Sequence, residues 1–268
     1  CVNLFYVTDI ETPMIYVKGI ASIETIREIK EKSPNNLFYQ CSTPDGYSGI
    51  VLAGHLEKFA FYNTPLTLHG LSKNSTGTSY LNADKASKEV SKEFFKKVND
   101  LKMHEKLGSV NYSPLISLMT ADFILMANDI NKTTFTIDLQ NLITKAFSEL
   151  EDGLFAEDNL SRELKIIHEI ALKTNNLSLF NKLLATKKRN KRYIFEGDGI
   201  SPRQIYLNAD KHQVFNIYEA SYFLYNVFNS RGRFKLGVFF RALLSSVKYS
   251  FASKRKINKL SDYHVLGD

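Results

Sequence analysis

The sequence predicts a mixed α/β fold in about the first 80 residues and a mainly α-helical region after them. Two observations carry this prediction. Short apolar, β-prone runs first alternate with helix signals, and segments with apolar residues at three- and four-residue spacing follow. The chain has 268 residues, of which 44% are hydrophobic and 24% charged, as in an ordinary soluble globular protein with a sizeable core.

In the first region, three apolar runs are predicted as strands, at residues 2–7, 13–20 and 59–69, and a fourth, at 37–40, as a short buried strand or a turn. Two helices separate them. Ser22 is an N-cap signal for a helix over residues 22–32, and Thr43-Pro44 starts a second helix that runs to about Gly54, because proline is tolerated at the first helical position.

The later helices are predicted from apolar spacing, with Ser113, Asp138 and Asn159 as cap signals. They cover residues 84–102, 113–128, 138–150, 159–173, 177–185 and 214–228. The predicted organisation has three parts: an α/β part over 1–80, a helical region over 81–190 and an aromatic, basic segment over 191–268.

Positive charge is concentrated near the C-terminus. The formal net charge is +7, yet residues 220–261 hold nine Lys and Arg and no acid. Such a local excess favours an anionic partner surface. Within it, the apolar and basic segment 234–251 suits an interfacial helix on anionic lipid, which would be membrane-associating, or equally a core helix with a solvated basic flank.

Other features of the sequence bear on the cellular compartment and on the class of protein. Cys1 and Cys41 form neither a metal-type spacing nor a disulfide framework, which suits a reducing compartment. No apolar run approaches the roughly 20 residues of a membrane span. The chain begins with a strand-like run at Cys1 rather than with Met, so we expect a fragment of a longer protein.

Asp45 is the candidate catalytic residue. A base that takes a proton from a sugar hydroxyl must be an ionised carboxylate aimed into a cleft, and the first turn of a helix stabilises such an anion. Gly46 beside it would leave room for a substrate. The alternative is that Asp45 only complements the helix terminus, which position alone favours.

The loop from His69 to Gly77 is the candidate phosphate-binding segment. It combines glycines, hydroxyls and one lysine before a helix start, and backbone N–H groups in such a loop can hold a phosphate. It is neither a Walker A sequence nor a nucleophile elbow. A plain glycine- and serine-rich connection is an equally good interpretation of its composition.

Together, three segments resemble the second half of the family 2 glycosyltransferases with the GT-A fold, of the bacterial surface-polysaccharide type. They are TPMIYVKGIASIETIREI (residues 12–29), STPDGYSGIVLAG (42–54) and YNTPLTLHGLSKNSTGTS (62–79). The last contains the pattern Gly-x-Ser-x-x-Ser-x-Gly at Gly70, Ser72, Ser75 and Gly77. The resemblance covers about residues 1–80 and continues loosely through the helices to about 186.

The resemblance implies the C-terminal half of a GT-A Rossmann-like nucleotide-diphospho-sugar transferase domain. It implies inverting transfer from a nucleotide-sugar donor to a saccharide or lipid-linked acceptor, in the cytoplasm and peripheral to the inner membrane. Asp45 would be the base. The implied substrate-binding residues are Pro44, Tyr47, His69, Gly70, Ser72, Ser75 and Gly77.

The family also implies a divalent metal, Mn or Mg, held at an Asp-x-Asp sequence. No Asp-x-Asp occurs in this chain, and the donor-binding half of the family has no counterpart in it. We therefore expect the chain to be incomplete as an enzyme. The competing hypothesis is a non-catalytic helical interaction or membrane-tethering module derived from a transferase. Nucleic acid is not expected as a partner, because no binding-fold signature accompanies the charge.

Overall fold

The computed structural model describes most of the helical part of the chain. The described residues are 12–15, 19–60, 89, 92–93, 96, 101–131, 135–151, 157–190, 199–200, 205–206, 208–229, 240, 243–244, 247 and 256–263. The chain divides into two compact units. Unit 1 comprises Cys1–Lys187 and Lys259–Asp268, and unit 2 comprises Lys188–Asn258, so unit 2 interrupts unit 1 in the sequence.

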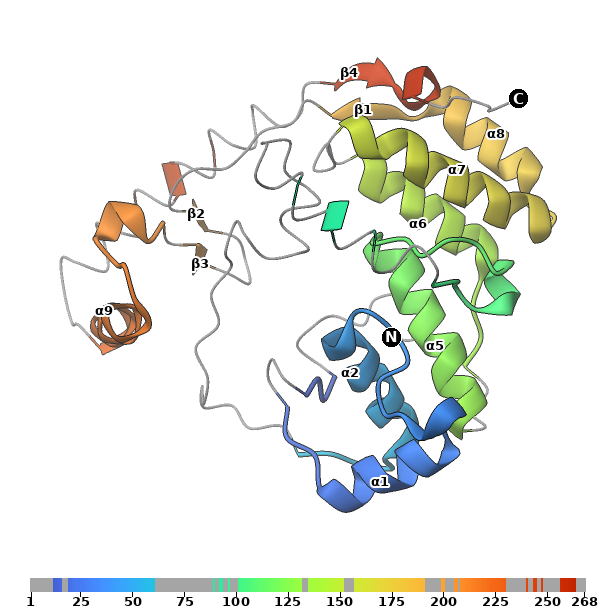
Figure 1. Ribbon diagram of the computed structural model, residues 1–268. Coiled ribbons are helices and arrows are strands. Elements are labelled where there is room, and N and C mark those ends of the chain that lie inside the picture. The colour runs from blue at the N-terminus through green and yellow to red at the C-terminus, as the bar shows by residue number, and fades with distance from the viewer. Residues whose placement is uncertain are drawn as a thin grey trace. The chain divides into compact units, whose positions relative to one another are not determined.

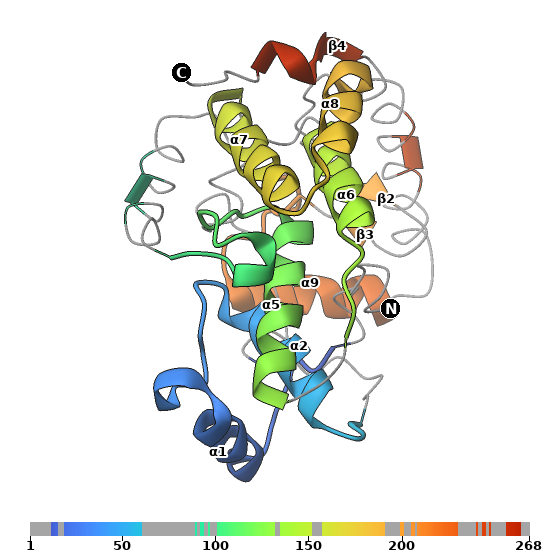
Figure 2. The same cartoon turned by 90° about the vertical axis from the view of Figure 1, so that its right-hand side faces the viewer.

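Unit 1 is built from helices (Figures 1 and 2). Those described are α1 (Ile23–Lys32), α2 (Pro44–His55), α5 (Ile116–Asn131), α6 (Leu139–Glu151), α7 (Glu157–Lys173) and α8 (Leu177–Thr186). Unit 1 also contains three short 3₁₀ segments, at Pro34–Asn36, Glu105–Leu107 and Leu260–Tyr263. The helices predicted from apolar spacing are confirmed in these regions, with ends that differ by three residues or fewer.

Helix α5 lies at the centre of unit 1 and belongs to two hydrophobic clusters at once. Its Leu118 and Leu125 enter one cluster, and its Ile124 and Ala127 enter the other. A helix that is apolar all round must be covered on both sides. Helix α5 therefore joins the N-terminal helices to the later ones in one folded unit.

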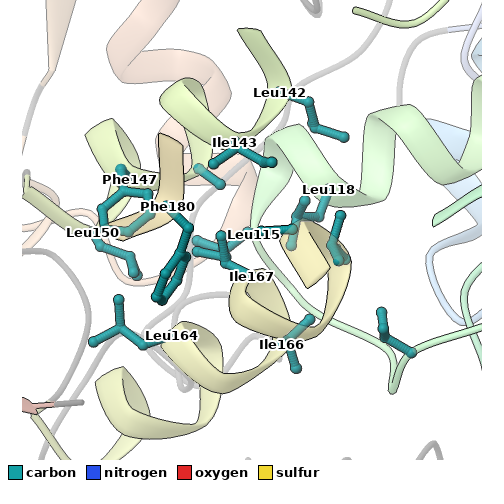
Figure 3. Packing of buried hydrophobic residues seen from close by; sticks show 14 of the residues in the cluster. Leu115, Leu118, Leu142, Ile143, Phe147, Leu150, Leu164, Ile166, Ile167 and Phe180 are labelled. Atoms are coloured by element: carbon teal, nitrogen blue, oxygen red, sulfur yellow. The ribbon is translucent and has the colours of Figure 1, made fainter. Parts of the chain in front are cut away.

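The larger cluster lies between α5, α6, α7 and α8 (Figure 3). Phe147 of α6 and Phe180 of α8 meet there edge to face, with ring centroids 5.4 Å apart. Leu260 returns to this cluster from the far end of the chain and is fully buried. Its backbone N–H donates to the carbonyl of Lys187 at 3.2 Å, which ties the last described segment to the end of α8.

The smaller cluster holds α1 and α2 against α5. Glycines allow the close approach of α2 to its neighbours. A Cβ at Gly46 would lie 3.0 Å from the ring of Phe123 in α5, and one at Gly49 would lie 2.7 Å from the side chain of Met14. Gly46, which the sequence suggested as space for a substrate, thus faces the core of unit 1.

The predicted GT-A Rossmann-like α/β fold is wrong. Within the described residues the strands are two to four residues long and form only two-stranded pairs. Residues 37–40 contain no strand, and the described residues of 13–20 show only an isolated bridge between Ile15 and Gly19. The apolar side chains that suggested a sheet, such as Met14 and Phe38, are buried against helices instead. Apolar runs this short do not distinguish a buried strand from other buried chain.

The predicted strands at residues 2–7 and over most of 59–69, and most of the helix predicted at 84–102, lie outside the described residues. The three-part division of the chain stays a prediction. Helices from its first two parts, α2 and α5, share one hydrophobic cluster.

Unit 2 begins with β1 (Lys188–Asn190), and β4 (Lys256–Lys259), at its end, is the hydrogen-bonded neighbour of β1. A second antiparallel pair joins β2 (Gly199–Ile200) and β3 (Ile205–Tyr206). The 3₁₀ segment Asp210–His212 then leads to α9 (Ile217–Asn229). The ring of Phe223 in α9 contacts the ring of His212, with centroids 4.7 Å apart and planes tilted by 37°. None of the helices in the described part of the chain has the length and apolar character needed to cross a bilayer.

Candidate functional site

The candidate site is the first turn of α2, which carries Asp45. Pro44 occupies the first helical position and is exposed, and Asp45 follows it with a half-buried side chain. Among the described residues, the Asp45 carboxylate has no hydrogen-bond or ion-pair partner. It lies in the first turn of α2, at the positive end of the helix dipole.

The start of α2 is fixed to α5 by side chains rather than by a local cap. Thr43 is the N-cap residue, as predicted, but its hydroxyl does not bond to the first turn. It forms a 2.6 Å hydrogen bond with the hydroxyl of Tyr112, which in turn contacts the sulfur of Met119 at 2.9 Å. This contact chain and the packing of Gly46 on Phe123 hold Asp45 in a defined place.

A second carboxylate, Asp122, lies buried in the middle of α5. It accepts a 2.6 Å hydrogen bond from the backbone N–H of His104, and this bond ties the 101–112 segment to the helix. Burial raises the pKa of Asp122 to about 6, and its contact with His104 opposes that rise. Asp122 was not among the predicted site residues, although a lone carboxylate in the apolar run LMTADFILM is a visible signal.

Both carboxylates act on the pKa of the Cys41 thiol. Burial raises the pKa of the Cys41 thiol to about 12, and Asp122 and Asp45 add to that rise. Burial likewise raises the pKa of Tyr112. A thiol with this pKa is protonated at neutral pH, and the half-buried Cys41 thiol contacts the carbonyl of Thr43 at 3.4 Å.

Tyr47 is buried in the aromatic part of the smaller cluster. Its ring has no exposed surface and meets Phe38 and Phe123 at centroid distances of 6.3 Å and 6.1 Å. Packing therefore accounts for this tyrosine, and its contact with a substrate stays a prediction. Ser48, one residue on, donates to the carbonyl of Asp45 and accepts from the N–H of Ile15, which fastens the 12–15 segment to α2.

The other predicted substrate-binding residues, His69, Gly70, Ser72, Ser75 and Gly77, lie outside the described residues. The described histidines near this end of unit 1 have structural partners. His55 bridges Glu28 and Asn131, and His104 pairs with Asp129 at 2.8 Å. In the part of the chain that the structure describes, no group of three or more His, Cys, Asp or Glu is placed to hold a metal ion. The divalent metal that the resemblance implies stays a prediction.

Comparison of the chain with protein-family models, with curated proteins and with solved structures found no match. The resemblance to family 2 glycosyltransferases therefore rests on the residues quoted from the sequence.

Proposed function

We propose that this chain provides the acceptor-side base of an inverting glycosyltransferase, which moves a sugar from a nucleotide-sugar donor to a saccharide or lipid-linked acceptor in bacterial surface-polysaccharide synthesis. Asp45 takes the proton of the attacking hydroxyl. The acceptor oxygen forms its bond to the anomeric carbon as the bond to the nucleoside diphosphate breaks, and the diphosphate leaves with the electron pair.

The observation that carries the proposal is the state of the Asp45 carboxylate. It is half-buried, it has no partner among the described residues, and it lies on a helix whose first turn is anchored to α5. A general base must be held in place by its surroundings and still be open to the proton it removes. Carboxylates with purely structural roles, such as Glu149 and Glu163, are instead saturated by hydrogen bonds in unit 1.

The competing role for Asp45 is to complement the dipole of α2. Helix α1 offers a matched control, because Glu24 occupies the second position of α1 as Asp45 occupies the second position of α2. If both carboxylates only complement a helix terminus, Asp45→Asn and Glu24→Gln should each change the free energy of unfolding by about 0.3–1 kcal/mol and do nothing else.

The test measures nucleoside diphosphate release by the complete protein that the gene encodes. A panel of uridine-, guanosine- and thymidine-diphosphate sugars is supplied with oligosaccharide and lipid-linked acceptors. Loss of a general base lowers the rate by about 10²–10⁴-fold. We expect Asp45→Asn to show this loss with unchanged circular dichroism, and Glu24→Gln to retain the full rate. Equal rates in the two variants, or no release by the unaltered protein, would overturn the proposal.

A further inference from the structure

Helix α9 of unit 2 presents an aromatic face to solvent. Tyr218, Tyr222 and Tyr225 recur at four- and three-residue spacing, so they lie on one side of the helix. Their exposed fractions are 78%, 64% and 64%. Phe215 and Ile217, at the start of the helix, are also more than two-thirds exposed. Large side chains gathered on one exposed face mark an interaction site.

The opposite face of α9 is the one that packs. Ala220, Phe223 and Leu224 are partly buried, and the ring of Phe223 contacts that of His212. A local cap fixes the helix start, since Asn216 accepts from the N–H of Glu219 and the Glu219 carboxylate accepts from the N–H of Phe215. The aromatic face is thus the outward side of a helix whose orientation is set by its own contacts.

A second helical stretch of unit 2 shows the same arrangement with aliphatic side chains. Phe240, Leu243, Leu244 and Val247 are helical and follow the spacing i, i+3, i+4, i+7. All four are exposed, Leu244 to 70% and Phe240 to 57%. Unit 2 therefore exposes one aromatic and one mainly aliphatic helix face.

The charge of unit 2 indicates what these faces meet. Residues 188–258 contain 14 Lys and Arg and four Asp and Glu, a formal charge of +10 against +7 for the whole chain. A second copy of the same unit would be repelled by this charge. Tyrosine rings suit the headgroup level of a bilayer, aliphatic side chains suit the acyl boundary, and lysine and arginine suit anionic lipid.

We propose that unit 2 is an insertion that docks on anionic lipid bilayers. Its two points of contact are the tyrosines of α9 (Tyr218, Tyr222 and Tyr225) and the four exposed apolar side chains Phe240, Leu243, Leu244 and Val247. A single-stranded nucleic acid would also meet a basic unit with exposed tyrosines, because bases stack on aromatic rings. It would leave Leu243, Leu244 and Val247 without a role, which favours lipid.

The experiment measures cosedimentation of the full chain with vesicles of phosphatidylcholine containing about 30% phosphatidylglycerol, and with vesicles of pure phosphatidylcholine. We expect binding that depends on phosphatidylglycerol. The triple variant Tyr218→Ser, Tyr222→Ser, Tyr225→Ser should bind at least about tenfold more weakly, because interfacial binding scales with the apolar area buried. The control replaces three exposed apolar side chains of unit 1, Ile20→Ser, Phe59→Ser and Leu172→Ser, and should bind as the unaltered chain does.

A second readout does not depend on the stability of a triple variant. The chain contains no tryptophan, so Tyr218→Trp introduces a single reporter. Its emission should shift to the blue when phosphatidylglycerol vesicles are added, and that of the control Phe59→Trp should not. An unshifted Tyr218→Trp, or equal vesicle binding by the two triple variants, would overturn the proposal. So would tight binding of a single-stranded oligonucleotide with no vesicle binding. Asp45→Asn should bind vesicles normally, so this proposal and the proposed function fail separately.

Discussion

The two units use similar helices in opposite ways. In unit 1 the apolar side of each long helix is covered, and the rings of Phe147 and Phe180 have no exposed surface. In unit 2 the three tyrosines Tyr218, Tyr222 and Tyr225 of α9 are exposed, Tyr218 to 78%. Apolar spacing therefore predicts that a helix forms, but not whether its face is covered by the same chain or by something else.

The two units also differ in formal charge. Unit 1 has 21 Lys and Arg against 24 Asp and Glu, a formal charge of −3, whereas unit 2 carries +10. The buried carboxylates of unit 1, those of Asp122 and Glu163, accept hydrogen bonds within the unit. Unit 2 combines exposed apolar faces with a large positive charge, a pairing that suits an anionic surface. Three experiments test this contrast, and they are given from the largest expected effect to the smallest.

Removal of an aromatic ring should have the most different effects on stability in the two units. Phe147→Ala leaves a cavity against Phe180 and should cost about 3–5 kcal/mol of the free energy of unfolding of unit 1. Phe215→Ala removes a ring that is 75% exposed and should change it by less than about 0.5 kcal/mol. Urea unfolding followed by circular dichroism, with amide exchange in α6–α8, measures both. Similar losses for the two variants would contradict the contrast.

The buried carboxylate of unit 1 should give a pH-dependent effect. The pKa of Asp122 is raised from 3.8 to about 6 in the folded protein, so the folded state holds this proton more tightly than the unfolded chain. The contribution of Asp122 to the free energy of unfolding is therefore greatest below about pH 4. It is lost as the pH rises through about 6, a change of about 3 kcal/mol.

Asp122→Asn keeps an oxygen to accept from the N–H of His104 and cannot ionise. Between about pH 4 and pH 6 the unaltered protein should lose stability that the variant keeps. The free energy of unfolding of the variant relative to the unaltered protein should therefore rise over this range and stay raised at pH 7. Urea unfolding at a series of pH values measures the difference. A difference that does not change with pH would show that the carboxylate does not titrate in this range.

Loss of a helix cap should have the smallest effect on stability. The caps of α5 and α9 differ in whether the capping side chain comes from another helix or from the same one. The Glu149 carboxylate, from α6, accepts from the N–H groups of Ile116 and Ser117 at 2.8 and 2.9 Å, so Glu149→Ala should cost unit 1 about 1–3 kcal/mol. Asn216→Ala removes a local cap and should cost about 1 kcal/mol, confined to α9. Amide exchange resolved by helix distinguishes the two. Loss of protection in unit 1 on Asn216→Ala would contradict the separation of the units.

Part of the candidate site was predictable from the sequence. Thr43-Pro44 marks the start of a helix wherever the chain lies, and it places Asp45 in the first turn. The contacts that fix this turn were not predictable. Tyr112 and Phe123 are separated from it by about 70 residues and reach it only because α5 packs on α2. The Rossmann-like sheet was predicted partly from runs whose described apolar side chains, such as Met14 and Phe38, are buried against helices.

The sequence by itself determined where the described helices lie, because their signals act over three or four residues. Ser22 accepts from the N–H of Thr25, and Asp138 accepts from those of Gln140 and Asn141, as the spacing predicted. Only the tertiary structure decided which groups cap the helix ends and which side chains meet in the core. Ser113, predicted to cap α5, accepts from the N–H of Leu115 and donates to Glu163, whereas Glu149 of α6 accepts from the first two N–H groups of the helix, those of Ile116 and Ser117. The reason is that such partners are chosen by the packing of helices distant in the chain, which local spacing does not record.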